Sequence, residues 1–129
     1  MPSEPILIVD DNPANLKLAR LLLTAEGHDA RTAPDAESAM KLLETFKPKL
    51  ILMDIQLPGM DGLELTRALK ANPATRHIVI VALTAYAMRG DEAKARAAGC
   101  DGYIAKPIDI HTLPGRITDY IAAAGSRTA

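Results

Sequence analysis

Five polar side chains carry the chemistry that this sequence suggests, and each follows a short apolar run. They are Asp10, Asp11, Asp54, Thr84 and Lys106. The apolar runs predict buried strands. Because the carboxyl ends of parallel strands meet at the edge where open α/β sheets hold ligands, we expect the five groups to converge. Asp54 is then the predicted nucleophile that accepts a phosphoryl group, with Lys106 and the Thr84 hydroxyl holding the phosphoryl oxygens.

The three aspartates predict a metal site. Carboxylates packed together repel one another and need a cation. Their oxygens suit Mg²⁺, whereas softer metals prefer His or Cys, which do not follow these strands. We expect Asp11 and Asp54 to bind Mg²⁺ directly and Asp10 to bind directly or through water. The backbone carbonyl of Gln56 is the further ligand that this arrangement predicts.

Strand and helix patterns alternate along the whole chain. The predicted strands are 6–9, 28–33, 50–53, 78–83 and 102–105, and the predicted helices are 13–26, 35–47, 63–72, 89–98 and 113–124, with Gly62 marking the loop before the third helix. This order predicts an α/β fold, (βα) five times over, with a parallel sheet covered by helices on both faces. Asn12 and Asp61 are predicted helix caps, and Gly27 and Gly99 are predicted helix ends.

Helical periodicity also predicts which side chains face the core. The predicted inward positions of the second and third helices are Ala36, Ala39, Met40 and Leu43, and then Leu65, Ala68 and Leu69. The fourth helix, 89–98, is different because its apolar residues are mostly alanines. Alanine favours helix but buries little area, so this helix is predicted to be weakly docked.

Composition limits the class of protein. The chain has 129 residues, 48% of them hydrophobic and 24% charged, which fits one domain, 1–129, with a frayed tail at about 125–129. A net charge of −1 gives no general attraction to nucleic acid or membrane. The single cysteine, Cys100, excludes an internal disulfide and favours a cytoplasmic location. The longest apolar run, Ile78 to Leu83, is far shorter than the ~18 residues of a membrane span.

Four motifs together resemble the response-regulator receiver domain of the CheY type. They are Val9-Asp10-Asp11, Met53-Asp54-Ile55-Gln56-Leu57-Pro58-Gly59-Met60-Asp61-Gly62, Leu83-Thr84-Ala85 and Lys106-Pro107. The resemblance covers Ile6 to about Ala124. It implies a flavodoxin-like three-layer sandwich with sheet order 2-1-3-4-5. The motif wording is most similar to DivK-like single-domain regulators and to receivers of hybrid kinases.

The resemblance also implies how the protein acts. A histidine kinase or a histidine phosphotransfer protein would donate the phosphoryl group to Asp54. Thr84 would shift and Tyr103 would turn inward, which alters the face of the fourth helix, fifth strand and fifth helix for a downstream protein. The protein would be a monomer or a phosphorylation-dependent dimer. It would be no enzyme beyond assisting its own phosphorylation and dephosphorylation, and Gln56 and Tyr86 lie where side chains tune the lifetime of the phosphate.

Other readings remain open at this stage. The chain is either a stand-alone regulator or a receiver excised from a hybrid histidine kinase. A haloacid-dehalogenase-type phosphatase also uses an Asp nucleophile with Mg²⁺, but it carries an Asp-x-Asp pair on its first strand, whereas here Asp10 and Asp11 are adjacent. A pseudo-receiver lacks an acid or the lysine, and all of these are present here. A flavodoxin needs a phosphate loop after the first strand, which this sequence does not have.

Overall fold

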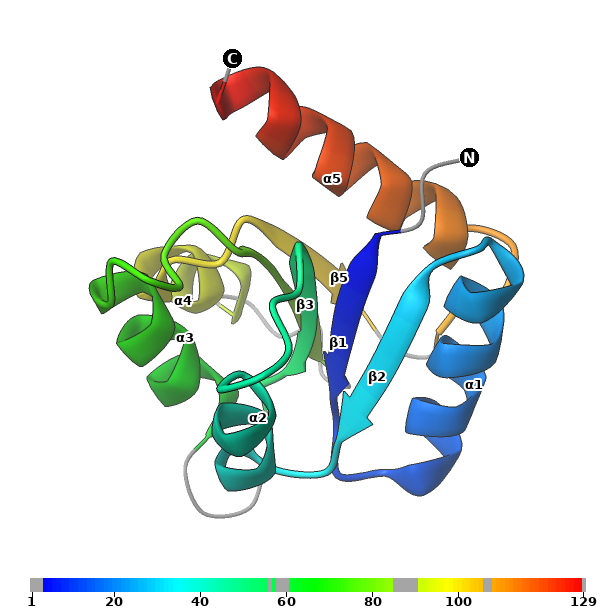
Figure 1. Cartoon of the computed structure of the whole chain (residues 1–129), viewed down its shortest axis with the longest axis horizontal. Coiled ribbons are helices and arrows are strands. Elements are labelled where there is room, and N and C mark those ends of the chain that lie inside the picture. The colour runs from blue at the N-terminus through cyan, green and yellow to red at the C-terminus, as the bar shows by residue number, and fades with distance from the viewer. Residues whose placement is uncertain (1–3, 56, 58–60, 85–90, 106–107, 129) are drawn as a thin grey trace.

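The computed structural model describes residues 4–55, 57, 61–84, 91–105 and 108–128. Strands and helices alternate through these residues (Figure 1). The strands are β1 Pro5–Val9, β2 Asp29–Ala33, β3 Leu50–Asp54, β4 Val79–Thr84 and β5 Gly102–Ala105. The helices are α1 Pro13–Ala25, α2 Ala36–Leu42, α3 Gly62–Ala71, α4 Asp91–Ala98 and α5 Leu113–Thr128. The predicted alternation of strand and helix is confirmed.

The five strands form one parallel sheet of order β2-β1-β3-β4-β5, as expected. Strand β3 lies at the centre, and all five of its residues are buried. Its register places Val9 of β1 beside Met53 and Leu83 of β4 beside Asp54. A strand covered on both faces reads as a continuous apolar run, which is why 50–53 was recognisable in the sequence.

The sheet separates two hydrophobic cores. Alternate residues of β1 point to opposite faces, so Leu7 and Val9 join one core while Ile6 and Ile8 join the other. Helices α2, α3 and α4 cover the first face, and α1 and α5 cover the second (Figure 1). This gives the three-layer sandwich and leaves the carboxyl ends of the strands at one edge.

Local signals fix the starts of α1 and α3 as predicted, whereas α2 ends at Leu42, before the predicted end at 47. The side chain of Asn12 accepts hydrogen bonds from Ala14 N and Asn15 N, and Asp61 accepts one from Glu64 N at the start of α3. Gly27 and Gly99 follow α1 and α4 with φ of 91° and 110°, values that favour glycine. Asn12 and Asp61 therefore start α1 and α3 beside the loops that carry the candidate site, while Gly27 and Gly99 end α1 and α4 at the opposite edge of the sheet.

Two predicted core positions are wrong. Met40 is 46% exposed, because the inward face of α2 is centred on Ala39 and Leu42 packs against the core instead. Ala68 of α3 is exposed and Thr66 is buried in its place. The Thr66 hydroxyl donates a hydrogen bond to Gly62 O at 2.7 Å, which satisfies a polar side chain that the sequence pattern assigns to the surface.

Helix α4 buries two alanines among its described side chains. Ala95 and Ala98 are buried, whereas Ala93 and Ala97 are exposed. Two methyl groups bury little apolar surface, and the weak docking of α4 stays a prediction. Helix α5 continues to Thr128, and fraying of its last turn stays a prediction. None of the helices in the described part of the chain is long and apolar enough to cross a membrane.

A charged network ties α3 to β4 and β5 at the sheet edge opposite the candidate site. Lys70 Nζ lies 2.9 Å from Asp101 Oδ2 and donates a hydrogen bond to Ile78 O at 2.7 Å. Asp101 Oδ2 also accepts a hydrogen bond from Ile80 N at 2.9 Å. Because this network anchors one end of α3, the other end at Gly62 is held in position beside the site.

Candidate metal and phosphoacceptor site

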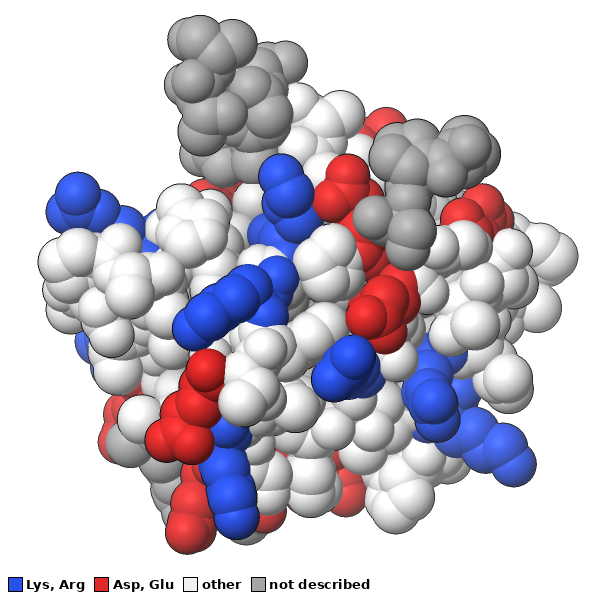
Figure 2. Space-filling view, viewed as in Figure 1, with Lys and Arg blue, Asp and Glu red and all other residues white. Residues whose placement is uncertain are grey.

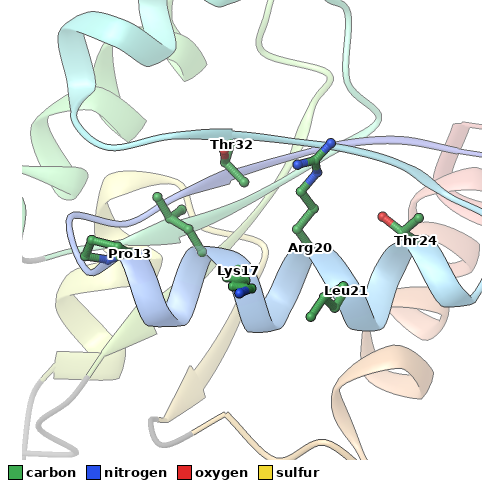
Figure 3. A pocket seen from close by; sticks show the side chains of 7 residues that line it. Pro13, Lys17, Arg20, Leu21, Thr24 and Thr32 are labelled. Atoms are coloured by element: carbon green, nitrogen blue, oxygen red, sulfur yellow. The ribbon is translucent and has the colours of Figure 1, made fainter.

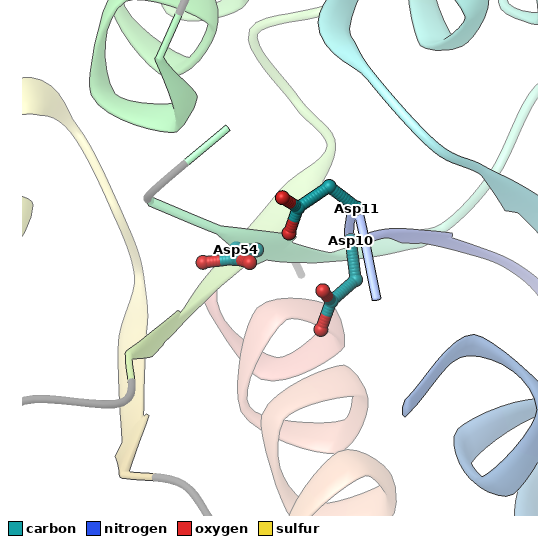
Figure 4. A group of neighbouring side chains, drawn as sticks. All are labelled: Asp10, Asp11 and Asp54. Atoms are coloured by element: carbon teal, nitrogen blue, oxygen red, sulfur yellow. The ribbon is translucent and has the colours of Figure 1, made fainter. Parts of the chain in front are cut away.

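Three carboxylates meet at the carboxyl edge of the sheet. Asp10, Asp11 and Asp54 each offer one oxygen, and these oxygens lie within 4.8 Å of one another. Asp10 and Asp54 are buried, with 0% and 2% exposure, while Asp11 is exposed. Their side chains face a common space between the ends of β1 and β3 (Figure 4). The convergence predicted for the acids is therefore present.

The sheet register brings the acids together. Val9 pairs with Met53, so the next residues along the chain, Asp10 and Asp54, are level with each other. The backbone N–H of Asp10 donates to Ala33 O at 3.1 Å, which ties the acid to the end of β2. Asp10 Oδ1 accepts a hydrogen bond from Asn12 N at 2.9 Å. This bond fixes the carboxylate plane, so Asp10 is a rigid member of the cluster.

Gly62 allows α3 to begin directly against the phosphoacceptor strand. A Cβ at Gly62 would overlap the carbonyl oxygen of Asp54 and would lie 2.7 Å from Ile55 Cα. The Gly62 N–H donates to Ile55 O at 3.3 Å, which joins the two segments. The sequence alone marks Gly62 only as part of the loop before α3. A glycine just after the Asp61 cap, where helix propensity disfavours it, was the available signal.

The donor set fits a hard divalent cation. All three side chains offer carboxylate oxygens, and two of them are buried, so their negative charges are poorly screened by water. Mg²⁺ takes oxygen ligands and is bound in proteins by one or two carboxylates together with water and phosphate oxygens. One exposed ligand, Asp11, leaves the site open on one side, where a phosphoryl group would enter.

Tyr103 is held through its backbone by two side chains of α5. The Tyr103 N–H donates to Tyr120 Oη at 3.4 Å, and Arg116 donates to Tyr103 O at 2.9 Å. The ring of Tyr120 lies so close to Gly102 that a side chain there would collide with it. The Tyr103 side chain is half-buried and packs against the core beneath α2, α3 and α4. Its switch role stays a prediction.

The remaining predicted site residues are only partly covered by the structure. Thr84 ends β4 and pairs in register with Ala105 of β5, which places it at the correct edge of the sheet. The position of its hydroxyl lies outside the described part of the chain. Lys106, Gln56 and Tyr86 also lie outside the described residues, so their roles stay predictions.

Comparison with known proteins identifies the family. A model of the response regulator receiver domain matches residues 6–118. The polar-differentiation response regulator DivK of Brucella anthropi is 43% identical over 119 residues, covering 92% of this chain and 97% of that protein. DivK of Brucella ovis is 42% identical over 122 residues, covering 95% and 99%.

Solved structures of receiver domains have the same fold as this chain. A response regulator from Chloroflexus aurantiacus has a TM-score of 0.88 at 29% identity and covers 94% of this chain and 99% of its own. The receiver domain of a sensor histidine kinase from Pseudomonas aeruginosa has a TM-score of 0.84 at 33% identity, covering 94% and 99%. That structure is described with a magnesium ion coordinated in its active-site cleft.

An open parallel α/β sheet with a carboxylate cluster at its carboxyl edge defines the class of protein, and the chain belongs to the response-regulator receiver family. Its acid triad matches the Mg²⁺ site of receivers. Membership makes it a two-component signalling domain with a histidine kinase as partner, not a classical enzyme. The haloacid-dehalogenase alternative is set aside on the same evidence.

Proposed function

We propose that Asp54 is the residue that takes up the phosphoryl group. The observation that carries this assignment is its place at the end of the central strand, buried, within 4.8 Å of the Asp10 and Asp11 oxygens. An Asp54 carboxylate oxygen attacks the phosphorus of a phosphohistidine. The P–N bond breaks, the imidazole leaves with the bonding electrons, and an acyl phosphate forms on Asp54. The donor is a histidine kinase or a histidine phosphotransfer protein.

The other side chains of the site are proposed to position the phosphoryl group and to neutralise its negative charge. Asp10, Asp11 and Asp54, with the Gln56 carbonyl, would hold Mg²⁺, which supplies positive charge to phosphoryl oxygens. The Asn12 N–H keeps Asp10 in a fixed orientation. Lys106 and the Thr84 hydroxyl are proposed to bind the remaining phosphoryl oxygens. Phosphoryl transfer depends mainly on such positioning and charge neutralisation, so a rigid cluster is sufficient.

Phosphorylation is proposed to act on the face formed by α4, β5 and α5. Helix α4 is suited to move because only Ala95 and Ala98 are buried among its described side chains. Thr84 and Tyr103 are the proposed switch residues, and the output is binding of a downstream protein or a phosphorylation-dependent dimer. We infer a cytoplasmic protein that acts without nucleic acid or membrane. The name shared by its DivK relatives makes polar differentiation the first process to test.

A mass measurement tests the acceptor. The protein is incubated with Mg²⁺ and phosphoramidate, a small donor with a P–N bond, and its intact mass is recorded. Wild type is expected to gain one phosphoryl group and Asp54→Asn none. Asp61→Asn is the matched control, since it removes a nearby acid outside the cluster and Asn is also a good helix cap. A phosphoryl group that persists in Asp54→Asn would falsify the assignment.

A second measurement addresses the output. Sedimentation velocity and affinity capture are compared for protein with and without beryllofluoride and Mg²⁺. A partner or a dimer that appears only in the treated sample supports the proposed switch. Identical behaviour of both samples, in protein shown to bind beryllofluoride, contradicts it.

A further inference from the structure

Strand β2 ends the sheet on one side, and surface hollows lie on both sides of it. One, of about 600 Å³, lies between α1 and β2 and is lined by Leu16, Lys17, Arg20 and Leu21 together with Thr32 (Figure 3). Another, of about 460 Å³, is lined by Thr32 again with side chains of α2 and the segment after it. A single residue of the outermost strand therefore borders both hollows.

The backbone of Thr32 faces away from the sheet. Asp29 N donates to Glu4 O and Ala33 O accepts from Asp10 N, so both residues turn their amide groups toward β1. Amide groups point to alternate sides along a strand. Thr32 lies one residue before Ala33, so its N–H and C=O point to the open edge. A strand laid along β2 would pair with Thr32 and direct its side chains alternately into the two hollows.

The first hollow is basic, whereas the second is lined by one cation, Lys41, and one acid, Glu44. Lys17 and Arg20 line the first hollow, and the segment from Asn12 to Ala25 contains no acidic residue. In Figure 3 the Arg20 side chain extends from α1 toward the strand, beside Thr32. In Figure 2 the lower right of the surface, over α1 and the lower part of β2, shows blue side chains and no red ones. Leu21 is 60% exposed and supplies an apolar contact next to these cations.

We propose that the β2 edge, with its two hollows, is a docking site for an extended acidic segment of a partner protein. The segment adds to the sheet as a strand beside β2, with main-chain hydrogen bonds to Thr32. Its acidic side chains enter the first hollow and pair with Lys17 and Arg20, while the alternate apolar side chains enter the second hollow beside Leu42. The site is separate from the proposed phosphoacceptor, and neither proposal depends on the other.

The test uses the full chain and short synthetic peptides. The probe is a peptide of alternating valine and glutamate, compared with one of valine and lysine and with a glutamate-rich helical peptide. Backbone amide NMR shifts give the affinity, and hydrogen exchange gives the protection of each amide. The valine–glutamate peptide is expected to shift the amides of β2 and to protect the Thr32 N–H. The two comparison peptides are expected to leave Thr32 unprotected.

Variants distinguish peptide binding by strand pairing from binding by charge attraction alone. Thr32→Pro removes an N–H that points away from the sheet, so the fold tolerates it while peptide binding, measured from the shifts of the remaining β2 amides, is lost. Lys17→Glu/Arg20→Glu is expected to weaken binding about tenfold. Arg67→Glu/Lys94→Glu, the same charge change at exposed positions of α3 and α4, should leave the affinity unchanged. Asp54→Asn should also bind as wild type does.

Three results would overturn the proposal. The first is equal affinity for the acidic and basic strand peptides. The second is binding of the helical peptide alone, with shifts confined to α1, which would make the groove a helix site. The third is self-association through β2 that excludes the peptide and is abolished by Thr32→Pro, which would make a second copy of this chain the occupant.

Discussion

Gly62 lies against the backbone carbonyl of Asp54 with no room for a side chain between them. The two residues belong to different elements, the first turn of α3 and the end of β3. Their contact brings the start of a helix next to the proposed phosphoacceptor, so the position of Asp54 depends on a residue that has no chemistry of its own.

Gly62→Ala is predicted to destabilise the protein by about 2 kcal/mol, because α3 or the Asp54–Ile55 backbone must move to make room. The same shift should slow phosphorylation by phosphoramidate. Urea denaturation and the rate of mass gain measure the two effects. Gly115→Ala is the control, since a Cβ there meets nothing within 4 Å and α5 should gain up to about 1 kcal/mol. Equal changes in stability for Gly62→Ala and Gly115→Ala would contradict the close contact between Gly62 and the Asp54 carbonyl.

Removing one acid from the cluster is predicted to stabilise the metal-free protein. Asp11→Asn removes repulsion with two carboxylates whose oxygens lie within 4.8 Å, a gain of about 1 kcal/mol at low salt. Mg²⁺ should raise the melting temperature of wild type and raise that of Asp11→Asn much less. Thermal denaturation with EDTA and with Mg²⁺ gives both values. Wild-type protein that melts at one temperature under both conditions would rule out a metal site here.

The Lys70–Asp101 pair is predicted to contribute to stability more than a surface ion pair does. Its side chains are 20% and 16% exposed, and Asp101 also accepts the Ile80 N–H. Asp101→Ala should cost about 2 kcal/mol, because it leaves Lys70 and the Ile80 N–H without this acceptor. The control is Asp29→Asn, which breaks a 3.6 Å pair with Arg31 that is half exposed and should change stability by less than about 0.5 kcal/mol. Urea denaturation of the two variants decides the ranking.

Cys100 gives a pH-dependent prediction. Burial of the thiol raises its pKa above the usual value, with the hydrogen bond to Thr66 opposing this. The group is neutral at pH 7 in both states, so its contribution to stability is complete below the unfolded pKa and is lost as pH rises toward the folded pKa. Alkylation by iodoacetamide should be slow in the native protein until the pH is well above neutral.

Cys100→Ala is the comparison for both measurements. Wild type should lose stability more steeply than this variant between pH 8 and 10, the range in which an unfolded thiol ionises. Parallel pH profiles, or native alkylation as fast as that in urea, would show that the thiol is not buried as described.

Local sequence signals predicted the elements and their order well. The continuous apolar run of β3, the caps Asn12 and Asp61 and the stop at Gly99 were each recognisable because their causes act over a few residues. Helix faces were predicted less well. Met40 and Ala68 lie outside the core because the direction in which α2 and α3 face the sheet depends on neighbours distant in sequence.

The acid cluster was predictable for a different reason. Parallel strands end at one edge, so Asp10, Asp11 and Asp54 had to be near one another once the strands were assigned. The resemblance to receivers then supplied the roles of Lys106, Thr84 and Tyr103, which stay predictions. Neither the strand order nor the resemblance to receivers predicted the contact of Gly62 with Asp54 or the hydrogen bond from Asn12 N to the Asp10 carboxylate.

By itself, the sequence determined the order of elements, the capped starts of α1 and α3 and which acids lie at the carboxyl edge, since periodicity, capping and strand direction are local properties. Only the tertiary structure decided how α3 meets β3 at Gly62, that Lys70 reaches Asp101 and that Thr32 borders two hollows at an open edge. These features depend on packing between segments far apart in the chain, where distances are set by side-chain volume and register together.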